Sequence, residues 1–417
     1  MNINRPPVQM YIVLLLLPML IPIYHSYDDQ HNKIYIYGII AAIIGFALTI
    51  TAFKQPDHFI KLSTLDITIL AIVLYVVINQ LIFGQYFDLQ IMSRVVAGAI
   101  VFLFFKNLGK QEGKVAQFID VFLILGIIEV LFVLAETLKL FSFSPDSVHS
   151  INGTFANPNV VAIFLAILIP LSFYRFYTSS RNKYLYLIYS LLFIIVIVLS
   201  KCRSAIVLSF FAIITYAIRS IPKWNLKKLL LIFALIVGLI SVFVFVNVQK
   251  KDSNVSRMLI WKVSVDMIKE KPFTGFGLSS FEKEYNLYQS KYLGKKDVSR
   301  EEILTAGYIR QPYNEFLYCW LTGGFIYFAL YLTLWGLSGY HLIKSFHKSS
   351  NLLKFTSAVT LTGLLLISTF TYTFYLTIIE FFFMSIRLFT QAILCRQLQL
   401  TDRLETTVKG FSHSALG

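Results

Sequence analysis

Residues 184–219 read YLYLIYSLLFIIVIVLS, then KC, then RSAIVLSFFAIITYAIR, and this stretch decides the class of fold. Residues 184–200 carry no charged side chain, and the following run is apolar from Arg203 to Arg219. A membrane core about 30 Å thick needs about 20 mostly apolar residues in a helix. Two such runs separated by KC predict two adjacent membrane-spanning helices joined by a tight turn.

The same pattern recurs along the whole chain of 417 residues. Twelve apolar runs are long enough to span a membrane: 8–25, 34–53, 66–84, 91–105, 116–137, 159–175, 184–200, 203–219, 228–248, 315–342, 355–372 and 375–395. The first run follows Arg5 but is not followed by a small-x-small cleavage site, so we interpret it as a retained span and not as a signal peptide. The sequence therefore predicts an all-α polytopic membrane protein with about twelve transmembrane helices.

The composition supports this class and excludes others. Apolar residues make up 57% of the chain and charged residues only 14%, whereas soluble domains average about 45–50% and about 25%. A soluble enzyme, a DNA-binding protein and a disordered chain are all disfavoured. The net charge of +15 resides in loops between apolar runs, which is typical of basic loops facing anionic lipid.

Lys and Arg residues in the short loops orient the chain. With the N-terminus in the cytoplasm, the inner loops and tails hold 19 of them and the short outer loops 4. The positive-inside rule then places both termini in the cytoplasm. We expect a multi-pass protein of the bacterial inner membrane, with its active site on the periplasmic side.

One predicted outer segment, residues 249–312, is long. It separates residues 1–248, with nine spans, from residues 313–417, with three spans and a short tail, and we expect all three parts to form one integrated domain. Between Val255 and Lys271, apolar residues recur at helical spacing. They are Met258, Trp261, Val265 and Ile268. A basic amphipathic helix of this kind is expected to lie on the outer membrane surface or to pack as a lid on the helix bundle.

Arginines gather on the predicted outer side: Arg94, Arg203, Arg257, Arg300 and Arg310. A guanidinium group forms paired hydrogen bonds with phosphate oxygens. Several of them around one outer cavity would suit a lipid-linked phosphate or pyrophosphate. For each of them taken singly, except Arg203, we favour contact with lipid headgroups.

Other ionisable residues are interpreted as structural. Glu129 and Glu136 lie two turns apart near the outer end of the fifth span, where Arg94 could pair with one of them. Glu380 and Arg387 on the last span have the same spacing. No metal-binding or nucleotide-binding motif is present, so we expect no cofactor. The three cysteines do not form a disulfide framework.

Three segments in order resemble the O-antigen ligase family of polytopic glycosyltransferases. The first is NGTFANPN at residues 152–159, leading into a span. The second is SKCRS at residues 200–204, with an arginine at the outer end of a span. The third runs from RMLIW at residues 257–261, through KPFTGFG at residues 271–277, to YNEFL at residues 313–317.

The resemblance implies a GT-C-like fold and a glycan donor carried on undecaprenyl pyrophosphate. It also implies transfer at the periplasmic face with inversion and without a metal. The family's essential arginines correspond to Arg203 and Arg257, which would hold the pyrophosphate leaving group and stabilise its developing charge. Further substrate-binding residues are expected at the other motif positions and outer arginines: Arg94, Arg310, Asn157, Asn159, Trp261, Gly275 and Gly277.

The chain departs from the family at Tyr313, where the family has a histidine. A neutral tyrosine with a pKa of about 10 is a poor base. Glu315 or His149 could serve as the base instead, or Tyr313 and Asn314 could position the acceptor while the arginines drive departure of the leaving group. We favour the last interpretation; an inactive relative is a further alternative.

The acceptor is left open between the lipid A–core, as for a ligase, and a protein Ser or Thr, as for an O-oligosaccharyltransferase. A repeat-unit polymerase would use the same chemistry, but such enzymes tend to have two sizeable outer loops. A glycolipid flippase or other transporter is an alternative of another class. The paired repeats typical of transporters are not found in this sequence.

Overall fold

The computed structural model describes residues 64–83, 112–142, 151–155, 157–220, single residues between 226 and 240, and residues 251–295, 298–346 and 351–371. Every regular element in these ranges is a helix. The predicted spans at 8–25, 34–53, 91–105 and 375–395, and most of 228–248, lie outside the described residues.

Seven helices coincide with predicted spans. They are α3 (Thr64–Phe83), α5 (Glu112–Thr137), α6 (Pro158–Thr178), α7 (Lys183–Leu199), α8 (Arg203–Ser220), α13 (Glu315–Ser345) and α14 (Leu352–Ile367). Five of them, all but α7 and α14, are long and apolar enough to cross a membrane. The all-helical, membrane-type architecture is therefore confirmed, while the count of twelve spans and their orientation stay predictions.

Helix α6 forms the centre of the bundle. It packs against α5, α7, α8 and α14, and every residue from Val160 to Ser172 is buried. A helix that is apolar on all sides is suited to such a central position. The carbonyl of Pro170, inside α6, accepts a hydrogen bond of 3.0 Å from the Tyr216 hydroxyl of α8.

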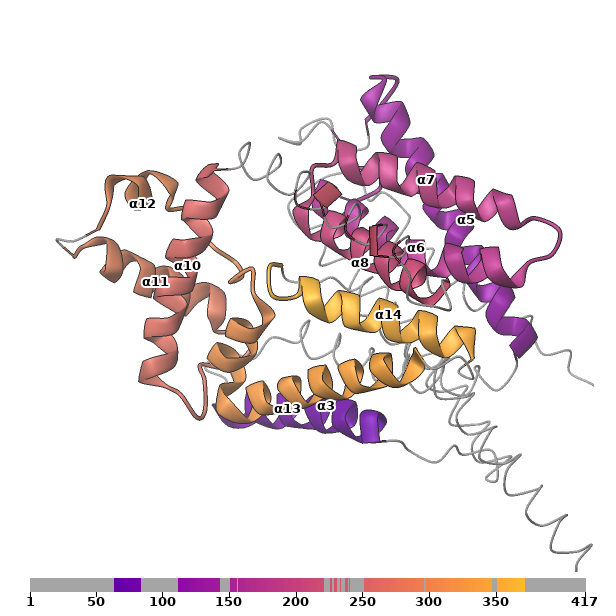
Figure 1. The fold of residues 1–417 in the computed structure, drawn as a ribbon. Coiled ribbons are helices and arrows are strands. Elements are labelled where there is room, and N and C mark those ends of the chain that lie inside the picture. The colour runs from indigo at the N-terminus through magenta and orange to yellow at the C-terminus, as the bar shows by residue number, and fades with distance from the viewer. Residues whose placement is uncertain are drawn as a thin grey trace, which may run out of the picture.

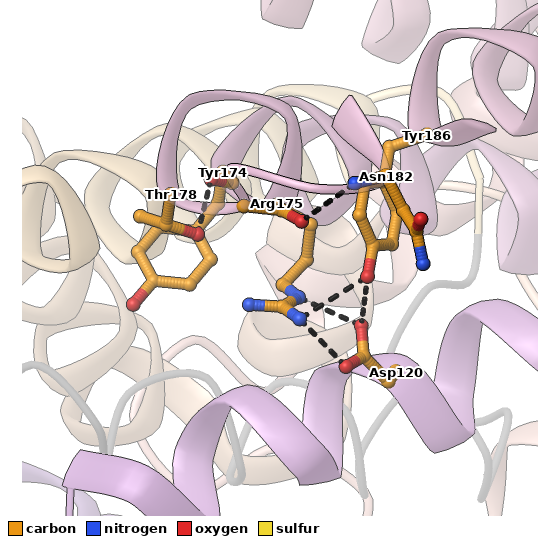
Figure 2. A network of polar contacts seen from close by, with 7 residues as sticks. Asp120, Tyr174, Arg175, Thr178, Asn182 and Tyr186 are labelled. Atoms are coloured by element: carbon orange, nitrogen blue, oxygen red, sulfur yellow. Dashed lines mark hydrogen bonds and ion pairs between the residues drawn. The ribbon is translucent and has the colours of Figure 1, made fainter. Parts of the chain in front are cut away.

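Helices α5, α6 and α7 are joined at one end by a polar network. Arg175 donates from Nε and Nη2 to the two carboxylate oxygens of Asp120, at 2.7 and 2.8 Å (Figure 2). Tyr186 donates to the same carboxylate at 3.0 Å. This ion pair is bidentate, the geometry that makes arginine–carboxylate contacts strong. On the predicted topology it lies at the cytoplasmic end.

Helix α13 is not the continuous span that the sequence predicts. Gly324 has φ 67° and ψ −167°, so the chain breaks there. The ring centroids of Phe316 and Trp335 are 6.0 Å apart, whereas a continuous helix would separate these residues by about 28 Å. The segment before Gly324 therefore folds back on the segment after it. Within α13, only the segment Phe325–Ser345 can still cross the membrane as a continuous helix.

The turn at Gly323–Gly324 is held by hydrogen bonds from outside the helix. Phe276 N donates to Leu321 O and Gly277 N donates to Thr322 O, both at 2.8 Å. The Tyr75 hydroxyl of α3 donates to Gly323 O at 2.6 Å. Since backbone groups within a membrane must find partners inside the protein, these bonds allow the break in α13.

Three further helices lie together at one end of the bundle (Figure 1): α10 (Lys251–Glu270), α11 (Phe281–Leu293) and α12 (Arg300–Thr305). The helix expected between Val255 and Lys271 is thus present as α10. Its buried face, however, consists of Leu259, Ile260, Val263, Met267 and Ile268.

Of the residues in the predicted apolar pattern, Ile268 is buried in the protein, whereas Met258 and Val265 are exposed. The buried face packs on α11, α12 and α13, as expected of a lid on the protein. The exposed face leaves Met258 and Val265 available for contact with lipid.

Candidate functional site

A cavity of about 210 Å³ lies where the first turns of α6, α8 and α10 meet. Its lining comes from the N-terminal parts of these helices, from the segment before α13 and from the end of the described chain after α14. The lining residues are Asn159, Val160, Ile163, Cys202, Arg203, Ser204, Ser253, Ser256, Arg257, Ile260, Ile309, Tyr313 and Thr371. Segments far apart in the sequence thus meet at the end of the bundle that carries α10.

Arg203 is the first residue of α8 and is half-buried in this cavity. Its Nη2 donates to Ser253 Oγ at 3.3 Å, and its Nη1 donates to Asn254 Oδ1. Both partners belong to the first turn of α10. Arg203 therefore joins a helix of the bundle to the unit of α10, α11 and α12 and places a positive charge at the cavity wall.

Arg257 reaches the same cavity from α10. Its Nη1 donates to Phe370 O at 2.8 Å, and its guanidinium carbon lies 5.2 Å from the centre of the Tyr313 ring. The charges of Arg203 and Arg257 repel each other. An anion bound between these two cations would relieve this repulsion.

Tyr313 is held in the left-handed region of backbone conformation, with φ 52°. A bulky residue rarely adopts this conformation, and such strain concentrates at functional sites. Neighbouring contacts fix it: Trp261 Nε1 donates to Pro312 O at 3.1 Å, and Asn314 caps α13 through bonds to Phe316 N and Leu317 N. Trp261 and Asn314 thus hold the segment that presents Tyr313, and neither lines the cavity.

Glu315 is not among the residues that line the cavity. Its side chain is buried, its backbone N–H donates to Ser368 O at 2.9 Å, and its charge acts on Cys319 and Tyr331. It therefore belongs to the interior of the folded-back helix. Its role as a base stays a prediction.

Two further predicted residues, Gly275 and Gly277, contact α13 and do not line the cavity. Gly275 has φ 66°, and a Cβ at this position would lie 2.6 to 2.7 Å from the backbone of residues 321–324. This close approach accounts for a glycine here without a substrate.

Arg310 also lies outside the cavity lining. Its Nε is 3.6 Å from Glu282 Oε1, and both side chains are exposed. Arg94 and His149 lie outside the described residues. Of the predicted outer arginines, the structure thus brings only Arg203 and Arg257 together among the described residues.

The start of α6 contributes one wall. Asn157 caps this helix by accepting a hydrogen bond of 2.8 Å from Asn159 N, and Asn159 lines the cavity. Asn159 O accepts a contact of 3.9 Å from Cys202 Sγ, next to Arg203. The first turns of α6 and α8 are therefore in direct contact.

Several lining residues were not singled out by the sequence. Ser253 lies four residues before Arg257 and Ile260 three after it, so helical spacing around Arg257 could have found these two. Ser256 lies three residues after Ser253. Thr371 is brought in by the tertiary fold alone, and no local pattern marks it. In the described residues no group of three His, Cys, Asp or Glu side chains could hold a metal ion.

Comparison with known proteins agrees with the motifs. The model of the O-antigen ligase family matches residues 166–332, which include Arg203, Arg257 and Tyr313. The predicted resemblance to this family is thereby confirmed. Neither the curated proteins nor the solved structures contain a match to this chain.

Proposed function

From the family match at residues 166–332 and the arginine-lined cavity, we propose that this membrane protein transfers a glycan from undecaprenyl pyrophosphate to an acceptor hydroxyl at the periplasmic face. The observation that carries the proposal is the convergence of Arg203 and Arg257 on one cavity. The family whose model matches residues 166–332 is that of the O-antigen ligases. The donor, the acceptor and the mechanism are our proposals.

The size of the cavity fits part of such a donor. At about 210 Å³ it is smaller than the roughly 300–1,000 Å³ of pockets that enclose a drug-sized ligand. It would hold a compact diphosphate, with the glycan and the lipid chain extending outside. Two guanidinium groups and the hydroxyls of Ser204, Ser253 and Ser256 provide donors to phosphate oxygens.

The chemistry follows from this arrangement. The acceptor hydroxyl oxygen attacks the anomeric carbon from the side opposite the phosphate, and the sugar–phosphate bond breaks with inversion. The bonding electron pair stays on the pyrophosphate, whose added charge the two arginines stabilise. The acceptor proton passes to water, so transfer needs no strong base at Tyr313.

The acceptor is the lipid A–core or a protein Ser or Thr, and surface glycans of a deletion strain decide between them. Loss of the lipopolysaccharide ladder with intact glycoproteins would indicate a ligase. Glycoproteins of lower mass with an intact ladder would indicate an O-oligosaccharyltransferase. A ladder reduced to one repeat would indicate a polymerase.

Complementation completes the test. The wild-type chain and an Arg310→Ala variant should restore the glycans, whereas Arg203→Ala should not. An unchanged deletion strain would reject the proposed transfer and favour transport or an inactive relative.

A further inference from the structure

Two buried carboxylates of α5 bind the backbone of the loop before α6. Glu136 Oε2 accepts hydrogen bonds of 2.7 Å from both Asn152 N and Gly153 N. Glu129 Oε2 accepts one of 3.1 Å from Thr154 N, and its Oε1 accepts another from the Thr154 hydroxyl. Three successive amides of one loop are thus held by two side chains that are almost fully buried.

Carboxylates suit this task. The amide of a buried loop needs an acceptor inside the protein, and a hydrogen bond to an ionised acceptor is stronger than one to a neutral acceptor. The loop conformation also depends on Gly153, which has φ 58°. A Cβ at Gly153 would lie 2.6 Å from Glu129 Oε2, so only glycine allows this close approach.

The loop leads directly to the cavity. Asn152 and Thr154 are buried, and Phe155 packs on Phe164 of α6 with ring centroids 5.7 Å apart. Two residues later Asn157 caps α6, and Asn159 and Val160 line the cavity together with Arg203. The two carboxylates therefore anchor the loop that leads into the wall formed by α6, next to Arg203.

We propose that Glu129 and Glu136 are positioning residues of the donor site, which fix the start of α6 relative to Arg203. The inference rests on the proposed function, because it takes the cavity to be the pyrophosphate site. Neither carboxylate lines the cavity, so they act through the loop and do not touch the donor. Displacing the loop should weaken donor binding while both arginines stay in place.

Three variants displace or preserve the loop by separate means. Glu136→Ala removes the acceptor of two amides. Glu136→Gln keeps one oxygen for them and places its NH₂ at Oε1, which has no hydrogen-bond partner in the described part of the chain. Gly153→Ala leaves both carboxylates intact but pushes the loop away from Glu129.

A matched control lies on the same helix. Asp120 binds Arg175 and Tyr186 at the opposite end of α5 (Figure 2), so Asp120→Ala also removes a carboxylate that ties α5 to its neighbours. It should lower the thermal midpoint and leave binding at the distant cavity within about twofold of wild type.

The measurement is the affinity of the full chain in nanodiscs for undecaprenyl pyrophosphate, taken together with the thermal midpoint. Glu136→Ala and Gly153→Ala should weaken binding by about tenfold to a hundredfold, the range expected when a binding group is misplaced by about 1 Å. Glu136→Gln should stay close to wild type. If Glu136→Ala does not accumulate, Gly153→Ala and Glu136→Gln still give the comparison.

Two results would overturn the inference. The first is that Glu136→Ala and Gly153→Ala lose thermal stability as Asp120→Ala does, but bind the donor with unchanged affinity. This result would make the role of the two carboxylates purely structural. The second is an affinity of Glu136→Gln for undecaprenyl pyrophosphate as weak as that of Glu136→Ala. This result would show that binding depends on the charge of Glu136 and not on the loop that it holds. If Arg203→Ala also bound normally, the donor site itself would be rejected.

Discussion

The guanidinium carbon of Arg257 lies 5.2 Å from the centre of the Tyr313 ring. A cation over an aromatic face is attracted to it by about 0.5–2 kcal/mol, depending on exposure. The ring therefore orients the arginine, and the hydroxyl is not needed for that contact. This relationship gives Tyr313 a role that differs from that of a general base.

Substitutions of Tyr313 distinguish the contribution of its ring to transfer from the contribution of its hydroxyl. Tyr313→Phe should keep most of the transfer rate because the ring face is retained. Tyr313→Leu should lower kcat/KM by about two- to thirtyfold, the equivalent of the cation–ring attraction. Transfer from an undecaprenyl-pyrophosphate-linked glycan is the assay. Equal losses in both variants would show that the phenol itself takes part in the chemistry.

Transfer should be far more sensitive to substitution of the two cavity arginines than to substitution of the other arginines that the sequence places on the outer side. Arg203→Ala and Arg257→Ala should each lower kcat by at least about a hundredfold, the usual cost of removing one donor that stabilises transition-state charge. Arg310→Ala is the matched control, because Arg310 is exposed and contacts Glu282. A similar loss for Arg310→Ala would contradict the assignment of the pyrophosphate to this cavity.

The helices that the sequence predicted well are those marked by long apolar runs. Arg203 opens α8 where the run of residues 203–219 predicted a span, because the transfer of apolar side chains into lipid dominates at this scale. The convergence of Arg203 and Arg257 was also predictable, since the order of motifs restricts which loops share one side of the membrane.

Two features depend on contacts that no local pattern records. The break of α13 at Gly324 requires the backbone of the loop that begins at Pro272 to replace helical hydrogen bonds. Hydropathy does not record such contacts, so from hydropathy alone the segment is predicted as one span. Glu129 and Glu136 were expected to be structural, with Arg94 as a partner of one of them. The contact with the amides of residues 152–154 depends on the loop conformation, whereas Arg94 lies outside the described residues.

The break in α13 predicts a sharp difference between glycines of the same helix. A Cβ at Gly324 would lie 2.0 Å from Phe273 O, whereas a Cβ at Gly339 meets nothing within 4 Å. Gly324→Ala should destabilise the chain by at least about 1–3 kcal/mol, the cost of backbone strain alone. Gly339→Ala should be neutral or slightly stabilising, because alanine favours the helix. Thermal midpoints in detergent check both, and equal midpoints would contradict the folded-back helix.

The last prediction concerns pH and the ion pair between α10 and α12. Lys262 Nζ lies 2.6 Å from Glu302 Oε1, and Ser299 N donates to Glu302 Oε2 at 3.0 Å. The hydrogen bond from Lys262, followed by that from Ser299, lowers the pKa of the Glu302 carboxyl below its ordinary value of 4.5. A lowered pKa in the folded state means that the stabilisation is complete above the unfolded pKa and is lost as the pH falls through the folded one.

Hydrogen exchange of α12 should therefore be slow and constant from neutral pH down to about 4.5, and faster below it after correction for the intrinsic rate. The acceleration should be at most about fivefold, because partly exposed ion pairs contribute about 1 kcal/mol or less. Glu302→Gln should exchange fast at neutral pH and lose most of the pH dependence. Glu301→Gln, at the exposed neighbouring carboxylate, should keep the wild-type profile; a flat wild-type profile would show that the pair does not hold α12 on α10.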